Sequence, residues 1–557
     1  MSHKAVAVAV LIAVFRVAAG ALAAAPTVTI DSGKLAGNEK DDMMSFLGIP
    51  YAAPPTGDLR WRAPQPVKTW QGTRQAPEFG PVCRQTVDWV KAPQSEDCLT
   101  LNVWAPVKKA SRPYPVLVWI HGGGLYSGYS SDGWGPEGGK SIVQNGMIFV
   151  TMNYRLGVFG FFAHPELSAD ASDHASGNQG FRDQIAALQW IKHNIAAFGG
   201  DPDRITIAGE SSGGDSVTAL TVSPLAKGLF QRGIAESGVI NPLAGKASAE
   251  RLGKELGETL RAPHLGDLRK LSAEDLLKQN WRPTPNLDGA VFTEQPQQSF
   301  AAGHQNKVPV LLGWNADEGV DLAPPITAAS YESQLQKGLG PQVVPFVLAR
   351  YPGKTDAQAV ASAQRLTDDW VGLQHFSWAT MQQKTNTQPV YIYFYVHSPA
   401  EPPAEHPCTY GCKAGHSSEV RFAYGRLWNE PRAWNKDDLA MQKQMLGYWT
   451  NFAKTGDPNS EGWSKWPVFD GTPDTVQRLG SAAEVKERGN FPDFRQPQWR
   501  DASEQNAEIL AFYDAMSLRS KPHFVGARPR CRLHVQVNPT AFVNKTRLLR
   551  TICSLGY

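Results

Sequence analysis

The sequence predicts an α/β fold in which a mostly parallel sheet is covered on both faces by helices. Two long apolar runs, Tyr114–Ile120 and Met147–Asn153, are continuous and not alternating, which is typical of strands buried on both faces. Segments with helical periodicity lie between such runs, and the clearest extends from Arg182 to Phe198. Strands that alternate with helices along the chain indicate a parallel sheet in the centre of the molecule.

The remaining elements follow from the same patterns. Further strands are expected at Thr27–Gly37, Phe46–Pro50, Ile205–Ala208, Val308–Gly313 and Val390–Val396. The helix at 182–198 carries one apolar stripe and ends at two glycines, 199 and 200; the stripe consists of Ile185, Leu188, Ile191, Ile195 and Phe198. Two long insertions, residues 240–300 and 320–390, are predicted to form helical lid and wall elements. Because no repeat or linker divides the chain, we expect one elaborated domain over residues 26–520.

Both ends of the chain differ from this domain. In residues 1–25, His3 and Lys4 precede an apolar run that ends in alanines. This pattern predicts a secretion signal that is cleaved between Ala23 and Ala25. Arg16 interrupts the run, so an uncleaved membrane anchor is the second choice, and no later segment approaches the length of a membrane span. We therefore expect a secreted or periplasmic protein. Residues 521–557 contain seven Lys and Arg and no acidic residue, and are expected to be a poorly ordered basic tail.

The bulk composition is that of a globular protein. Of 557 residues, 42% are apolar and 19% are charged, with a formal net charge of +3. The basic excess lies in the tail and not on a folded face, so nothing indicates a nucleic-acid partner. The sequence carries no prediction of oligomeric state.

Six cysteines fit an exported protein with disulfides. Cys83 and Cys98 would close a short loop and are the preferred pair. The pairs Cys408 with Cys412 and Cys531 with Cys553 are each either bonded or free. Cys408, Cys412 and His416 resemble part of a zinc site, but no fourth ligand is evident and no metal is predicted.

The segment Arg204–Gly214 contains the motif Gly-x-Ser-x-Gly, from Gly209 to Gly213, between a β-branched run and a predicted helix. The order of strand, tight turn and helix is what a nucleophile elbow requires, with Ser211 exposed at the tip of the turn. Glycines at both ends of the motif leave room where a Cβ would collide with backbone. By itself the motif is common in ordinary loops. It supports a catalytic serine only if the other parts of a catalytic site are also present in the sequence.

A glycine-rich segment, His121–Gly128, follows directly after the first long strand. Consecutive glycines let backbone N–H groups point inward, as an oxyanion hole for ester hydrolysis requires. Standing alone, the segment would be a flexible turn; its place between a buried strand and the elbow favours the oxyanion hole.

A serine nucleophile needs a histidine base and a carboxylate that orients the base, in the chain order Ser, acid, His. Asp317 and Glu318 lie just past a predicted strand end, and His416 lies in a later loop. Position alone does not distinguish His416 from His397 or His406.

The sequence resembles the type-B carboxylesterases, an α/β-hydrolase group that also contains cholinesterases and some fungal lipases. The resemblance covers residues 27–515, and its motifs are Leu47–Pro55, Ser95–Val103, Asn153–Gly157, Phe198–Pro202, Leu287–Gly289, Asn315–Gly319 and Phe452–Asn459. It implies the α/β-hydrolase fold and a serine hydrolase that cleaves carboxylic esters of small molecules through an acyl-enzyme, without metal or organic cofactor.

The resemblance also assigns roles to residues. It implies Ser211 as nucleophile, Glu318 as triad acid and His416 as base, with Asp317 as the alternative acid. Gly123, Gly124 and the N–H of Ser212 would form the oxyanion hole, Glu210 and Ser237 would orient other groups, and the Cys83–Cys98 bridge is a family feature. Ser212 stands where the family commonly has alanine, and the cysteines before His416 are not part of the general pattern.

Two other functions fit the sequence less well. A catalytically inactive adhesion relative usually lacks a member of the triad, whereas all three are present here. A true lipase needs a large apolar lid, and neither insertion is apolar enough to predict one.

Overall fold

The computed structural model describes residues 25–496, except 133–137, 240–241, 340–343, 405–407, 409 and 431. The predicted leader, apart from its last residue, lies outside the described residues. So do the predicted tail at 521–557 and the pair Cys531 and Cys553. The predicted boundaries of the leader and the tail therefore remain predictions.

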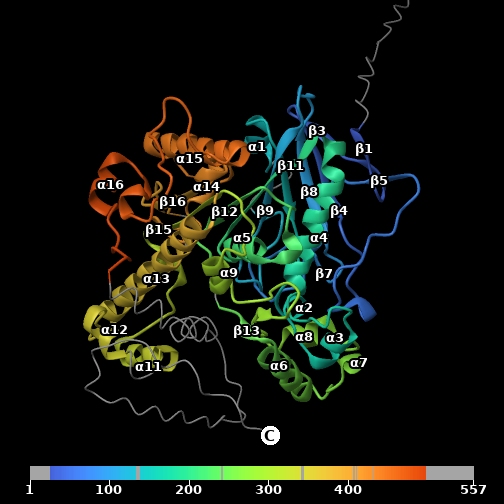
Figure 1. Cartoon of the computed structure of the whole chain (residues 1–557), viewed down its shortest axis with the longest axis horizontal. Helices are drawn as coiled ribbons and strands as arrows, with labels where there is room; N and C mark the ends of the chain where they lie inside the picture. The colour runs from blue at the N-terminus through green and yellow to red at the C-terminus, as the bar shows by residue number, and fades with distance from the viewer. Residues whose placement is uncertain are drawn as a thin grey trace, which may run out of the picture. The chain divides into compact units, whose positions relative to one another are not determined.

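A ten-stranded mixed sheet forms the centre of the fold (Figure 1). In spatial order its strands are β17 (Gln477–Leu479), β16 (Val390–Tyr395), β15 (Val310–Asn315), β12 (Arg232–Glu236), β11 (Gly200–Glu210), β9 (Tyr114–Ile120), β10 (Ile148–Met152), β8 (Thr100–Pro106), β4 (Met43–Pro50) and β3 (Asn38–Lys40). Every pair from β17 to β10 is parallel, and β8, β4 and β3 add antiparallel strands at one edge. The predicted α/β class and mostly parallel sheet are confirmed.

Shorter strands form three small sheets. They are β1 (Thr27–Ile30), β2 (Gly33–Ala36) and β5 (Thr73–Gln75) in one sheet, β6 (Val82–Cys83) with β7 (Gln94–Ser95), and β13 (Ala244–Gly245) with β14 (Asn286–Leu287). The predicted strand at 27–37 is thus a hairpin, because Thr27 pairs with Ala36 and the chain turns between Ile30 and Gly33.

Sixteen helices of the described residues surround the sheets. They are α1 (Lys140–Gln144), α2 (Gly157–Gly160), α3 (Pro165–Asp170), α4 (Gln179–Asn194), α5 (Ser212–Val222), α6 (Lys246–Thr259), α7 (Leu265–Leu268), α8 (Ala273–Leu277), α9 (Pro296–Ala302), α10 (Glu318–Leu322), α11 (Ala328–Leu339), α12 (Val344–Arg350), α13 (Asp356–Thr385), α14 (Val420–Ala423), α15 (Lys436–Thr455) and α16 (Ala482–Arg488). The predicted helix at 182–198 is α4 followed by a 3-10 turn, Ile195–Phe198, and Gly199 ends it with φ +86°. The insertion at 320–390 is largely helical, as expected, whereas in the insertion at 240–300 the helices α6 to α9 alternate with irregular segments and two short strands.

Alternate side chains of the central strands enter two separate cores. Val116, Val118 and Ile120 of β9 pack with residues of α4, α5 and α13 on one face. Leu117 and Trp119 of the same strand pack with α1, α14 and α15 on the other face (Figure 1). Burial on both faces explains the continuous apolar strands, because each fully buried Val, Leu or Ile contributes about 1.5–3 kcal/mol to folding.

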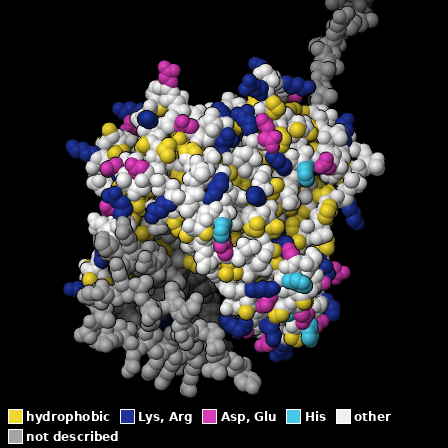
Figure 2. Space-filling model, viewed as in Figure 1, with side chains coloured by type: hydrophobic (Ala, Val, Ile, Leu, Met, Phe, Trp, Pro, Cys, Tyr) yellow, Lys and Arg dark blue, Asp and Glu magenta, His cyan; other side chains and the backbone are white. Residues whose placement is uncertain are grey.

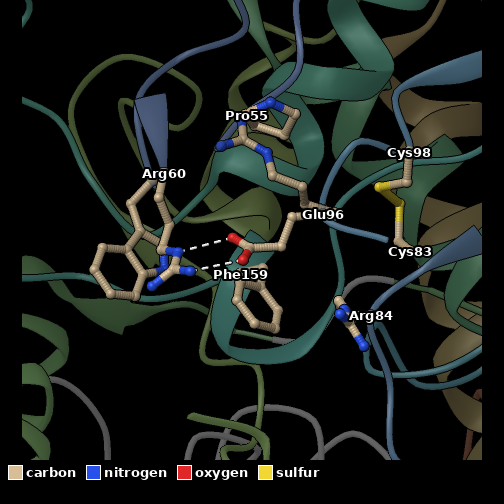
Figure 3. Close-up of a pocket in the computed structure, with 9 residues that line it drawn as sticks. Pro55, Arg60, Cys83, Arg84, Glu96, Cys98 and Phe159 are labelled. Carbon is tan, nitrogen blue, oxygen red and sulfur yellow. Dashed lines mark hydrogen bonds and ion pairs between the residues drawn. A yellow bond between two sulfur atoms is a disulfide. The ribbon is translucent and has the colours of Figure 1, made fainter. Parts of the chain in front are cut away.

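A small charged pocket lies beside the Cys83–Cys98 disulfide (Figure 3). Arg60 forms two hydrogen bonds with the carboxylate of Glu96, of 2.7 and 2.6 Å, and also donates to the carbonyl oxygens of Arg269 and Leu271. One buried guanidinium therefore joins the disulfide loop to the segment between α7 and α8. The predicted pairing of Cys83 with Cys98 is present.

The surface carries both signs of charge. On the face drawn in Figure 2, Lys and Arg side chains are interspersed with Asp and Glu, without a continuous basic area. Within the described residues, none of the helices combines the length and the apolar character needed to cross a membrane.

The buried side chain of His397 joins the end of β16 to two helices. His397 Nδ1 lies 3.0 Å from Glu484 of α16, and its Nε2 lies 2.9 Å from Asp438 of α15. Burial alone would lower the pKa of His397, but the hydrogen bonds and charges of Glu484 and Asp438 outweigh it and raise the pKa. The charged form therefore stabilises the fold.

We predict that this stabilisation depends on pH. It is fully present below the unfolded-state pKa of about 6.5 and is lost as the pH rises through the higher folded-state pKa. Urea unfolding of the wild type and of His397→Gln at pH 5.5 and pH 9 should show that the difference in free energy of unfolding shrinks at the higher pH. A difference that is the same at both values would contradict the assigned charge.

Candidate active site

Ser211 lies in a sharp turn between β11 and α5. β11 ends at Glu210, α5 begins at Ser212, and Ser211 itself has φ +56° and ψ −128°. A positive φ is strained for serine, so the surrounding backbone must hold it. A Cβ at Gly209 would lie 2.5 Å from the carbonyl carbon of Gly213, and a Cβ at Gly213 would overlap the carbonyl oxygen of Ile120. The glycines of the motif are therefore required by close backbone packing at the elbow.

The glycine-rich loop abuts this elbow. A Cβ built at Gly122 would lie 3.0 Å from the Cβ of Ser211. Gly123 and Gly124 adopt φ values of +103° and +62°, conformations that glycine reaches without strain. The loop that carries the predicted oxyanion donors therefore lies directly against the predicted nucleophile.

The hydroxyl of Ser212, which departs from the family pattern, has a defined partner. The backbone N–H of Leu125 donates to its Oγ at 3.1 Å. This bond joins the first residue of α5 to the glycine loop, so the extra hydroxyl holds the two halves of the predicted oxyanion hole together.

His416 and Glu318 meet although 98 residues separate them in the chain. His416 Nδ1 lies 2.5 Å from Glu318 Oε2, and both side chains are buried. Their loops are joined by backbone bonds, since Asp317 forms a β-bridge with Gly415 and its N–H donates to Ala414. A carboxylate at Nδ1 holds the ring in one orientation and places the imidazole proton there, which leaves Nε2 as the basic nitrogen.

The structure separates the two candidate acids. Glu318 Oε1 accepts hydrogen bonds from Ser237 Oγ at 2.6 Å and from the N–H of Asn315 at 2.8 Å. Asp317 turns away from the histidine, where its carboxylate pairs with Arg488 and accepts the N–H of Ala414. Of the two, Glu318 is the carboxylate in contact with His416.

The other nitrogen of His416 faces Glu210, the neighbour of Ser211. Nε2 lies 3.2 Å from Glu210 Oε1 and makes no hydrogen bond to any residue that the structure describes. Glu210 is held by Ser417, whose Oγ donates to Oε1 at 2.5 Å. Burial alone would lower the pKa of His416, but the charges of Glu210 and Glu318 outweigh it and raise the pKa above its ordinary value.

This arrangement predicts the pH dependence of hydrolysis. His416 must be neutral to accept a proton, so a raised pKa moves the acid limb of the kcat/KM profile to higher pH. Glu210→Gln keeps an oxygen that can accept from Ser417 but removes the charge, and should move that limb to lower pH by about one unit. Glu255→Gln, an exposed change on α6, serves as the control. An acid limb that stays in place in Glu210→Gln would show that Glu210 does not set the basicity of His416.

Two more buried glutamates, Glu419 and Glu236, lie beside the site, and no motif in the sequence predicted a role for them. Glu419 accepts a hydrogen bond from Asn315, and burial together with the charges of Glu210 and Glu318 raises its pKa to about 8. Glu236 accepts from Tyr424 Oη at 2.6 Å and from Trp449 Nε1 at 2.9 Å. Glu419 follows His416 by three residues, and Glu236 directly precedes Ser237. Their closeness in sequence to predicted site residues is the one feature that could have indicated a place in the site.

A second disulfide lies just before the base. Cys408 and Cys412 are bonded, and the carbonyl of Cys412 accepts the N–H of Gly415. The sequence left this pair open. In the structure the bond constrains the loop that carries His416.

A strained serine between a strand and a helix, an adjoining glycine loop and a buried His–carboxylate pair on a mostly parallel sheet are the features of an α/β-hydrolase with a serine nucleophile. Residues 24–495 match the profile of the Carboxylesterase family, and the chain belongs to this family. It is a carboxylic ester hydrolase, which cleaves esters to acid and alcohol by the serine mechanism general to the family.

Known relatives cover most of the chain. Fumonisin B1 esterase from Sphingopyxis macrogoltabida is 35% identical over 466 residues, which are 79% of this chain and 84% of that protein. Para-nitrobenzyl esterase from Bacillus subtilis is 34% identical over 473 residues, 79% of this chain and 92% of that protein. A solved PNB esterase structure superposes with a TM-score of 0.70 at 32% identity, covering 84% of this chain and 99% of the other.

Proposed function

We propose that ester hydrolysis in this chain is carried out by Ser211, His416 and Glu318. The observation that supports this most strongly is the 2.5 Å contact of His416 Nδ1 with Glu318 Oε2, which leaves Nε2 without a hydrogen bond to any described residue, 3.2 Å from Glu210, the residue that precedes Ser211. We also propose that the N–H groups of Gly123, Gly124 and Ser212 bind the oxyanion.

The proposed reaction proceeds in two halves. His416 Nε2 takes the proton of Ser211 Oγ while the oxygen attacks the ester carbonyl carbon, and the resulting oxyanion accepts hydrogen bonds from the three N–H groups. The bond to the alcohol oxygen then breaks, and His416 gives its proton to the departing alcohol. His416 then takes a proton from water, and the resulting hydroxide attacks the acyl carbon. The bond between this carbon and Ser211 Oγ breaks, the acid leaves, and His416 gives the proton to Ser211 Oγ.

Pre-steady-state kinetics test this proposal. Para-nitrophenyl acetate should give a burst of nitrophenol equal to about one equivalent of enzyme if deacylation is the slower half. The acetyl group trapped by acid quench during the burst should be found on the peptide that contains Ser211. Acetyl on a different residue would overturn the assignment of the nucleophile.

We further propose that the protein acts outside the cytoplasm, after removal of residues 1–25. Support comes from the alanine-rich leader and from the Cys83–Cys98 and Cys408–Cys412 disulfides, which persist in oxidising compartments. N-terminal sequencing of the protein from periplasm and medium tests it, with a start between residues 24 and 26 expected. A chain that keeps its leader in the cytosol would contradict it.

A further inference from the structure

Arg282 lies against the wall of the predicted oxyanion loop. Its guanidinium carbon is 4.4 Å from the centre of the Tyr126 ring. Tyr126 follows Gly124 by two residues, and a Cβ built at Gly124 would lie 2.5 Å from that ring. The Tyr126 ring therefore contacts both the Arg282 guanidinium and Gly124, whose backbone N–H is proposed to bind the ester oxyanion.

The backbone around Arg282 is fixed. The segment between α8 and β14 is attached to the body of the protein by Trp281, whose Nε1 donates to the carbonyl of Phe161 at 3.3 Å and whose ring packs on Phe162. Thr284 Oγ1 donates to the carbonyl of Arg282 itself. A guanidinium placed by a fixed backbone and an aromatic face loses little further freedom when it binds a ligand.

No acidic side chain pairs with Arg282 among the residues that the structure describes. Two arginines buried elsewhere do have an acidic partner: Arg60 pairs with Glu96, and Arg155 pairs with Asp183. Arg282 and Tyr126 are both only partly exposed. A partly desolvated cation without a counter-ion favours an anionic ligand, and the planar guanidinium can form two parallel hydrogen bonds with a carboxylate.

We propose that Arg282 is a specificity-determining residue that binds a carboxylate of the substrate, so that the enzyme prefers esters with a free carboxylate group. This inference rests on the proposed function, because it places the ester carbonyl at Gly123 and Gly124. The carboxylate belongs either to the acid part or to the alcohol part of the ester, and two pairs of substrates distinguish these cases.

The experiment compares charged esters with neutral counterparts of nearly equal size. For the acid part, the pair is mono-para-nitrophenyl glutarate and para-nitrophenyl glutaramate. For the alcohol part, the pair is para-acetoxybenzoate and para-acetoxybenzamide. Arg282→Gln should lower kcat/KM for the charged ester of at least one pair by about 10- to 100-fold, and change the neutral ester by less than about twofold.

Two variants serve as controls. Arg282→Lys keeps the charge without the planar fork and should retain part of the preference. Arg251→Gln removes one positive charge from an exposed position on α6 and should leave the charged-to-neutral ratio unchanged. Added salt should lower the ratio of kcat/KM for the charged ester to kcat/KM for the neutral ester in the wild type. In Arg282→Gln the same ratio should not change with salt.

The result that tests the inference is the ratio of kcat/KM for the charged ester to kcat/KM for its neutral counterpart. Loss of preference in one pair identifies the part of the ester that carries the carboxylate. A ratio that is the same in Arg282→Gln and wild type for both pairs would overturn the inference. Titration with an organophosphate keeps this failure separate from that of the proposed function, since labelling of Ser211 and hydrolysis of neutral esters do not require Arg282.

Discussion

Replacement of Ser211 by alanine is expected to lower kcat for para-nitrophenyl esters by about 10⁶-fold, as loss of the nucleophile does in comparable serine hydrolases. The only atom removed is Oγ, and alanine can occupy the same turn, although Ser211 has φ +56°. The backbone bonds of the turn, from the N–H of Ser211 to Glu236 and from the N–H of Asp215 to Ser211, do not use the side chain. Stability should therefore change little.

The thermal midpoint, measured beside the kinetics, controls for folding. A variant with an unchanged midpoint and no activity agrees with the proposed role. A variant that folds and still hydrolyses esters within about tenfold of the wild-type rate would require a different nucleophile.

Replacement of Glu318 by glutamine is expected to lower kcat by about 10⁴-fold. The amide keeps the size of the side chain and an oxygen that can accept from Ser237 and Asn315. It removes the charge that stabilises the imidazolium of His416, and its NH₂ group favours the wrong tautomer of the ring. The measurement is steady-state kinetics over a range of pH.

Asp317→Asn is the matched control for this prediction. It makes the same chemical change one residue earlier, where the carboxylate pairs with Arg488 and not with His416. We expect a modest loss of stability and a kcat within about tenfold of the wild type, since a partly exposed ion pair contributes little. If Asp317→Asn abolished activity while Glu318→Gln did not, the acid would be Asp317.

The fold was predictable from sequence to the extent that burial leaves a pattern. β9, β10 and β16 are buried on both faces and appear as unbroken apolar runs, so their positions were predicted to within one residue. β12, Arg232–Glu236, was missed, because a charged residue at each end interrupts its apolar run. Its glutamate, Glu236, is buried only because Tyr424 and Trp449 come from distant segments to bind it. No local sequence pattern around Glu236 predicts partners that lie so far away in the chain.

The site was predictable where the backbone constrains the residue type. The elbow and the oxyanion loop require glycines at fixed positions, so their motifs are visible in the sequence. The choice between Asp317 and Glu318 depended on a resemblance, since neighbouring carboxylates look alike until their partners are known. The contact of Arg282 with Tyr126 could not be predicted from the sequence either. Arg282 lies in an irregular segment far from Tyr126 in the chain, and only the folded structure brings the two side chains together.

The proposed mechanism requires that Ser211 is the residue that becomes acylated. Treatment of the folded protein with a fluorophosphonate, followed by peptide mapping in a mass spectrometer, tests this directly. We predict one equivalent of label on the peptide containing Ser211, loss of activity in proportion to labelling, and no label in Ser211→Ala. Complete inhibition with the label on any other residue would contradict the account.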